Sequence, residues 1–369
     1  MKEDATFYYI AWVIVLIIAL IERLRKKPFN NVLISIIFMV AAIVVACRVE
    51  VGADWDHYRF IFYNGYDEYR DTVSLEPLFM FFRSFFFSLG FTHAVFFLFL
   101  SLLSLFAIRK TAELFGIKYF MMVFLIYYSL FFLNYQFNIV RQGIMASFVW
   151  LSFAYKSRGE TKAAIVSMAV ALGFHVAALV FIPFLFIFDR IYSKSVVLIV
   201  LAFSFLTYFL QLSMRIIAYF PLLFELERTA SFVTSGQFVK DYGLTIGSLI
   251  QVFLFLILYF WYGDSYKKKP VFRILINSLL FNFMLLCVLN AFYAIISRIC
   301  NALFMAMAFL LPLYLEELKQ PINRLIIETL IIIYLLLSLP KTFVIQEDGY
   351  SEMLPYKFEL MQLIDKNVK

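Results

Sequence analysis

Two arginines stand out in this sequence because the residues around them are almost all apolar. Arg141 lies in the run Asn-Ile-Val-Arg-Gln-Gly, and Arg298 lies in the run Ser-Arg-Ile-Cys-Asn. A charge within a membrane segment is costly and is therefore usually kept for function. The arginine fork binds phosphate oxygens in pairs and stays charged, so both residues favour a phosphate or diphosphate ligand.

Three residues are candidates for catalysis, because a carboxylate or a histidine can orient or deprotonate an acceptor hydroxyl. Asp54 begins the triplet Asp-Trp-Asp, Glu76 precedes Pro77, and His175 follows Gly-Phe between two apolar runs. Each has a structural alternative. Glu76 could favour a helix dipole, and a lone histidine is often only structural. The triplet matches a metal-binding D-x-D pattern, but three residues are a weak signal, so we predict neither a metal nor another cofactor.

Other polar residues are expected to bind the substrate beside these groups. Arg48 follows the second apolar run, where it could instead pair with Glu50 or Asp54. For each arginine the alternative is an anchor whose charge reaches the membrane surface. The predicted substrate-binding residues are Arg48, Tyr58, Asn138, Arg141, Gln142 and Arg298.

The composition predicts the kind of protein that positions these residues. Of 369 residues 64% are hydrophobic, and the mean hydropathy is +0.88, which excludes an ordinary soluble domain. The apolar runs are continuous rather than alternating, which indicates helices and not a barrel. The net charge of +7 is typical of basic cytoplasmic loops and does not require a nucleic-acid partner.

We therefore predict an all-α polytopic membrane protein with about twelve transmembrane helices, in a range of roughly 11 to 13. Apolar runs at 6–21 and 32–46 flank the basic segment 23–28, which the positive-inside rule places in the cytoplasm. The first outer loop, 48–92, then lies outside. Within it the segment 77–91 is short and contains Arg83, so we expect an interfacial or re-entrant helix there.

The positive-inside rule also predicts the topology of the rest of the chain. Spans at 119–133 and 139–154 are joined by a short outer turn at 134–138, and the segments 109–118, 156–162 and 316–324 face the cytoplasm. A single span at 163–188 would place the lysines 267–269 outside. We therefore predict a helical hairpin that turns at 173–175, with His175 at its outer tip. A second outer loop follows at 213–243, the tail after Pro340 lies outside, and 1–369 forms a single membrane domain.

The outer location restricts the chemistry of the site, because no ATP and no nucleotide sugars are present there. The substrate must carry its own activation, as does a sugar on a lipid pyrophosphate. Cations are then needed where the leaving group gains negative charge. Aromatic residues make up 20% of the chain and can cover the apolar faces of sugars.

These residues, in order, resemble the EpsG-like group of Wzy-type polysaccharide polymerases. The similarity rests on Arg48, Val-Gly-Ala-Asp54, Tyr58, Glu76-Pro77, Asn138 to Gln142, and Phe174-His175. It implies a glycosyltransferase C-like enzyme of the bacterial inner membrane, with its active site on the periplasmic face. The implied reaction transfers the growing glycan from undecaprenyl pyrophosphate to a fresh lipid-linked repeat unit of O-antigen or capsule. The implied partners are that lipid-linked oligosaccharide, membrane lipid, a flippase and a chain-length regulator.

Two alternatives remain open at this point. An O-antigen ligase, or a transferase that uses a lipid-monophosphate sugar, would share the outer arginines and form a different product. A flippase of lipid-linked oligosaccharides would perform no chemistry and would need polar residues through both leaflets. The polar residues named above gather near the outer edge, which favours an enzyme.

Overall fold

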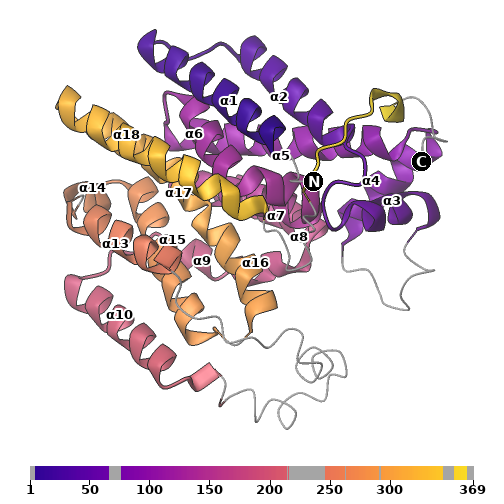
Figure 1. Ribbon diagram of the computed structural model, residues 1–369. Helices are drawn as coiled ribbons and strands as arrows, with labels where there is room; N and C mark the ends of the chain where they lie inside the picture. Colours follow the sequence, from indigo (N-terminus) through magenta and orange to yellow (C-terminus); the bar gives the residue numbers. More distant parts are fainter. Residues whose placement is uncertain are drawn as a thin grey trace. The chain divides into compact units, whose positions relative to one another are not determined.

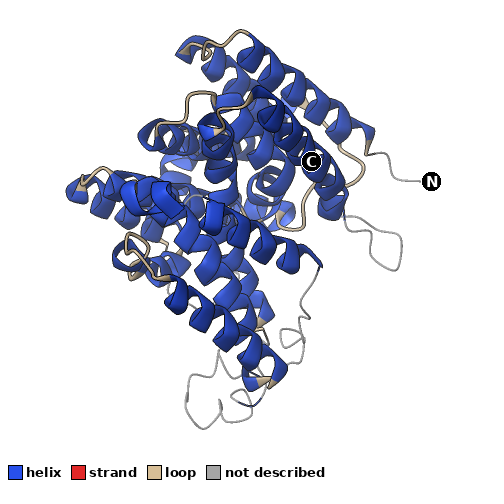
Figure 2. Ribbon diagram, turned by 90° about the vertical axis from the view of Figure 1, so that its left-hand side faces the viewer, coloured by secondary structure: helices blue, strands red, loops and turns tan. Residues whose placement is uncertain are grey.

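The computed structural model describes residues 5–65, 76–213, 215, 246–261, 263–290, 292–343 and 353–363. The described residues are 81% helix and form no strand (Figure 2). Among the described residues, five helices are long and apolar enough to cross a membrane, at Thr6–Leu24, His93–Phe115, Pro270–Val288, Ile296–Glu317 and Pro321–Lys341. The all-α fold class is thus confirmed, with five candidate membrane spans. Several other apolar helices are shorter, so the total of about twelve spans stays a prediction.

The chain divides into two compact units. The first unit comprises residues 1–182 and 311–369, and it contains every predicted site residue except Arg298. Its α-helices are α1 (Thr6–Leu24), α2 (Asn31–Ala46), α3 (Trp55–Asn64), α4 (Pro77–Ser88), α5 (His93–Phe115), α6 (Phe120–Tyr127), α7 (Val140–Ser157), α8 (Thr161–Phe174) and α18 (Pro321–Ser338) (Figure 1). Two π-helical turns, η1 (Tyr128–Phe132) and η2 (Asn134–Asn138), join α6 to α7.

The second unit comprises residues 183–310, and its helices pack around α15 (Pro270–Val288). The others are α9 (Phe184–Ile187), α10 (Lys194–Phe209), α13 (Ile246–Trp261), α14 (Gly263–Lys268) and α16 (Tyr293–Phe304), while α17 (Ala306–Glu317) begins in this unit and ends in the first. Arg273 donates to the Asp189 carboxylate over 2.8 Å and to the Lys267 carbonyl over 2.9 Å. The basic segment at 267–269 and the turn after α9 therefore lie at the same end of this unit.

The buried carboxylate of Glu22 and the half-buried one of Glu316 connect the basic turns of the first unit at one end, which we call the basic end. Glu22 accepts hydrogen bonds of 2.9 Å from the backbone N–H groups of Phe29 and Met121. Glu316 accepts one of 2.9 Å from the N–H of Lys118. Helix N-termini carry partial positive charge, so carboxylates are stabilised there. The segments predicted to be cytoplasmic at 23–28, 109–118 and 316–324 thus lie together.

A C-terminal segment, 353–363, lies along the opposite end of the first unit, which we call the site end. The N–H of Val49 donates to the Lys357 carbonyl over 3.1 Å, and the N–H of Glu359 donates to the Cys47 carbonyl over 2.8 Å. Tyr356 stacks on Phe7 with ring centroids 3.9 Å apart. The tail therefore lies on the same side as the first loop, as predicted, and braces the start of that loop.

Local conformation differs from the sequence prediction at two places. The expected turn at 134–138 is the π-helical turn η2, and the chain leaves helical geometry only at Ile139. Within the first loop the structure adds α3, whose buried residues Trp55, Tyr58 and Ile61 recur at helical spacing. The predicted break at 173–175 is confirmed, because α8 ends at Phe174 and His175 is extended. The second outer loop, 213–243, lies almost entirely outside the described residues.

Replacement of Tyr356 by alanine tests the bracing role of the C-terminal segment. The variant loses the Phe7 stack and the 2.8 Å hydrogen bond from its hydroxyl to the Val44 carbonyl. We expect the midpoint of thermal unfolding in detergent to fall by roughly 5 °C. Phe358→Ala is the matched control, because that ring is 51% exposed. Equal midpoints for the two variants would contradict the bracing role.

Candidate functional site

Arg48 fixes the beginning of the loop that follows α2. Its side chain is fully buried and donates to the backbone carbonyls of Val45, Val51 (3.1 Å) and Phe137 (3.3 Å). The guanidinium also lies 4.7 Å from the ring centroid of Phe97. A buried charge must be compensated, and backbone carbonyls of this chain provide the compensation. The arrangement attaches the loop to η2 and leaves the Arg48 side chain no exposed surface.

Gly52 and Asn138 complete this attachment. Gly52 has φ +98°, and a Cβ atom there would lie 2.3 Å from the Phe137 carbonyl oxygen. Only glycine allows both this backbone conformation and this close approach. The Asn138 side chain accepts a 2.7 Å hydrogen bond from the N–H of Ala53. Asn138 thus holds the backbone of the loop in place.

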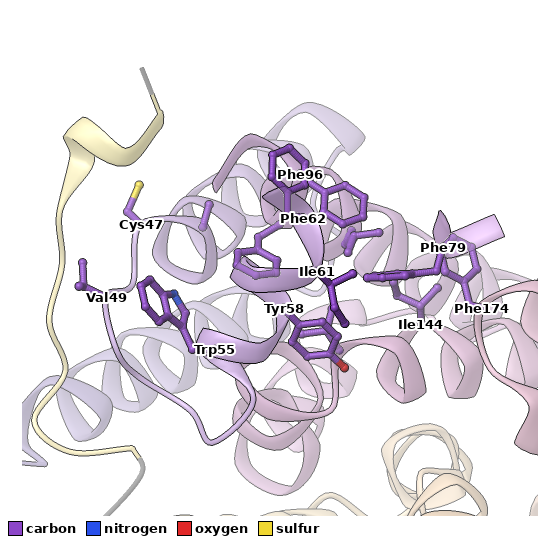
Figure 3. Packing of buried hydrophobic residues seen from close by; sticks show 14 residues of the cluster. Cys47, Val49, Trp55, Tyr58, Ile61, Phe62, Phe79, Phe96, Ile144 and Phe174 are labelled. Carbon is purple, nitrogen blue, oxygen red and sulfur yellow. The ribbon is translucent and has the colours of Figure 1, made fainter. Parts of the chain in front are cut away.

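The loop leads into α3, which packs into an aromatic core at the site end. Figure 3 shows Tyr58 and Phe62 of α3 with Phe79 of α4 and Phe96 of α5 in this cluster. Arg83 of α4 donates to the carbonyls of Ile61 (3.0 Å) and Phe62 (2.9 Å), in the last turn of α3. A cation at a helix C-terminus is stabilising. This contact accounts for a charge in the apolar helix α4.

A close contact between α4 and α8 places Glu76 at the site. A Cβ atom on Gly173 would lie 2.5 Å from Cγ of Leu78, so glycine permits α4 to approach α8. Glu76 immediately precedes α4, and His175 immediately follows α8. The contact therefore brings these two predicted residues together.

Five of the predicted residues form one group, which we call the site cluster: Tyr58, Glu76, Arg141, Gln142 and His175. Arg141 forms an ion pair with Glu76, and Nε2 of His175 lies 3.9 Å from the other Glu76 oxygen. The side chains of Arg141, Glu76 and His175 are 16%, 11% and 13% exposed. The ion pair is therefore largely shielded from solvent.

Aromatic rings hold the Arg141 guanidinium in place. It lies 5.5 Å from the ring centroids of Tyr58 and Phe79. The Tyr58 hydroxyl oxygen lies 3.5 Å from both the backbone N and the Nε of Arg141. Burial, reinforced by the charge of Asp54, raises the pKa of Tyr58, although Arg141 opposes this shift. The hydroxyl thus stays protonated at neutral pH and can donate to a ligand.

Hydrogen bonds determine which nitrogen of His175 carries the proton. Nδ1 accepts from the N–H of Ala177 over 3.1 Å, so the neutral ring is protonated on Nε2. Nε2 lies 3.5 Å from the amide of Gln142. Since Nε2–H can only donate, we orient the amide with its oxygen toward His175. Neutral His175 is then a hydrogen-bond donor, which leaves Glu76 as the proton acceptor of the cluster.

Within the first unit, the predicted residues Arg48, Asp54 and Asn138 are not part of the cluster. Asp54 is half-buried just before α3, and it acts on the cluster through its charge on Tyr58. Arg298 is exposed on α16 of the second unit, so its placement beside the cluster stays a prediction. Among the described residues, no group of three His, Cys, Asp or Glu side chains could hold a metal ion. The contacts of Gly52, Gly173 and Arg83 were not predicted from the sequence. The two glycines were noted only as parts of motifs, and Arg83 only as the charge that marks the segment 77–91.

A comparison with protein-family models now decides the family. The model of the EpsG family matches residues 31–358, which include every residue of the site cluster. The chain belongs to the EpsG family. This membership confirms the resemblance and indicates a polymerase-type role in polysaccharide biosynthesis. No curated protein and no solved structure matches this EpsG-family chain.

Alanine at Gly52 tests the close attachment of the loop to η2. Gly159→Ala is the matched control, because Gly159 has φ +77° and no atom lies within 4 Å of its Cβ position. The control should lose about 1 kcal/mol through backbone strain alone. Gly52→Ala should lose about 2 kcal/mol more, because its methyl group would overlap the Phe137 carbonyl. Equal losses of stability on thermal unfolding in detergent would show that the loop is not attached in this way.

Proposed function

We propose that this protein is a glycosyltransferase that polymerises oligosaccharide repeat units carried on undecaprenyl pyrophosphate. The product is an O-antigen, a capsule or an exopolysaccharide, formed at the outer face of the bacterial inner membrane. The observation that carries this proposal is the ion pair of Arg141 with Glu76, which is shielded by Tyr58 and Phe79. Membership of the EpsG family supports it. A flippase and a chain-length regulator are the expected partners.

Arg141 is the proposed ligand of the donor pyrophosphate. Its guanidinium is planar and permanently charged, so it can bind two phosphate oxygens at once. The rings of Tyr58 and Phe79 both contact the guanidinium, and they restrain its orientation before the substrate arrives. A restrained cation in a shielded site stabilises developing negative charge better than one in water.

Glu76 is the proposed base for the acceptor hydroxyl. The acceptor oxygen forms a bond to the anomeric carbon, and its proton passes to Glu76. The bond from that carbon to the pyrophosphate oxygen breaks, and the electron pair leaves with the lipid pyrophosphate. Glu76 thus loses its negative charge as the leaving group gains one. Arg141 can pair first with the Glu76 carboxylate and then with the leaving pyrophosphate. The charge of the guanidinium therefore stays compensated throughout the reaction.

His175, Gln142 and Tyr58 are proposed to orient the reacting groups. Neutral His175 presents Nε2–H toward Glu76 and Gln142. The His175 ring thus lies beside the Glu76 carboxylate, and the Tyr58 hydroxyl restrains the Arg141 side chain. Both are positioning roles in the free protein, and both groups can donate to phosphate or sugar oxygens when the substrate binds.

Replacement of either partner of the ion pair tests the function. Arg141→Ala removes the phosphate ligand, and Glu76→Gln removes the base while retaining its shape. We expect each variant to lower polymer formation at least about 100-fold in a strain that lacks the natural protein. Polymer is measured by gel electrophoresis, and the amount of variant protein in the membrane by immunoblot.

The matched control for Glu76→Gln is Glu113→Gln. Glu113 pairs with Arg109 over 3.1 Å in the last turns of α5, toward the basic end. This variant removes an ion pair of the same type and should retain full polymer formation. Normal polymer from Arg141→Ala, with normal protein in the membrane, would disprove the assignment.

A further inference from the structure

A pocket lies on the face of α3 that points away from the aromatic core. Residues 53, 56, 57, 60 and 64 recur at helical spacing and line it, whereas Trp55, Tyr58 and Ile61 on the other face are buried. Its volume is about 580 Å³. The side chains that line it are Asp56, His57, Arg59, Phe60, Tyr63 and Asn64.

Packing behind the pocket restrains two of these side chains. The Arg59 guanidinium lies 5.4 Å from the ring centroid of Trp55. The Tyr63 hydroxyl lies 3.1 Å from Nδ1 of His93, and the two rings meet edge to face. Side chains that are ordered before binding lose little entropy when a ligand arrives. The pocket is thus a largely pre-formed surface.

The chemistry of the lining selects one class of ligand. Phe60 and Tyr63 offer rings on which the apolar face of a sugar can pack. Asp56, Arg59 and Asn64 offer a carboxylate, a guanidinium and an amide that can hydrogen-bond to hydroxyl groups. A lipid chain would leave these polar groups unsatisfied, and the opposite charges of Asp56 and Arg59 leave the lining no net charge to favour an anion. An oligosaccharide can pack its apolar faces on the two rings and form hydrogen bonds with the polar side chains through its hydroxyl groups.

The pocket and the site cluster share α3. His57 lines the pocket, and the neighbouring Tyr58 belongs to the cluster, with ring centroids 6.1 Å apart. We propose that the pocket is a glycan subsite, which binds the saccharide of the lipid-linked repeat unit and selects which repeat units are polymerised. This inference rests on the proposed function, since it gives the substrate of the cluster a second point of contact.

Binding of a free oligosaccharide tests the subsite without any need for catalysis. The probe is the oligosaccharide released by mild acid from the lipid-linked intermediates of a host strain that lacks this protein. Saturation-transfer NMR with the purified full chain in detergent measures its binding. Phe60→Ala and Asn64→Ala should each weaken binding about tenfold, through loss of a ring contact or a hydrogen bond.

Two further variants make the result specific. Phe85→Ala removes an aromatic ring that is 49% exposed on α4, outside the pocket, and should bind the probe like the natural protein. Arg141→Ala should also retain binding, because the probe carries no pyrophosphate. Unchanged binding by both Phe60→Ala and Asn64→Ala would overturn the subsite and leave the proposed function standing. If the natural protein binds the probe through these residues but forms no polymer from the lipid-linked unit, the subsite stands and the polymerase assignment fails.

Discussion

An ionised group buried among apolar side chains must have a partner, and this requirement organises the first unit. The buried Arg48 and the half-buried Arg83 use backbone carbonyls, and the buried Glu22 and the half-buried Glu316 use backbone N–H groups. These partners are fixed parts of the fold, so the four charges attach one segment to another. Arg141 and Glu76 differ, because each is compensated by a side chain of opposite charge. A side-chain partner can be exchanged for a ligand, which is what an active site requires.

The same distinction explains how the loop that follows α2 supports the site cluster. Arg48, Gly52 and Asn138 attach the loop to the π-helical turn η2. That turn leads directly into α7, whose second residue is Arg141. The loop continues into α3, which returns Tyr58 to the Arg141 side chain. The attachment therefore sets the distance between the Tyr58 ring and the Arg141 guanidinium. The side chains of Arg48 and Asn138 themselves are not part of the site cluster.

Much of this arrangement could be predicted from the sequence, because apolar runs and basic turns are local signals. The end of α2 at Ala46, the start of α4 at Pro77 and the break at His175 follow from them. Partners distant in sequence could not be predicted. Arg48 was expected to bind substrate, but its partner at Phe137 is 89 residues away and is set by tertiary packing.

The π-helical geometry of η2 was also not predictable, because its residues do not differ in type from those of a turn. The grouping of Glu76, Arg141 and His175 was proposed from their common outer level, and their actual contact depends on Gly173 and Leu78. Sequence patterns thus identified the charged residues, whereas packing decided which of them attach segments and which form the cluster.

The most direct test of the polymerase assignment is reconstitution with purified protein. The full chain in detergent is mixed with repeat unit on undecaprenyl pyrophosphate, without any nucleotide, and the products are separated on a gel. The account predicts a ladder of glycans that grow by whole repeat units, with release of the lipid pyrophosphate. Flipping of the same lipid in liposomes without any ladder would contradict it, and would identify the site cluster as part of a transport path.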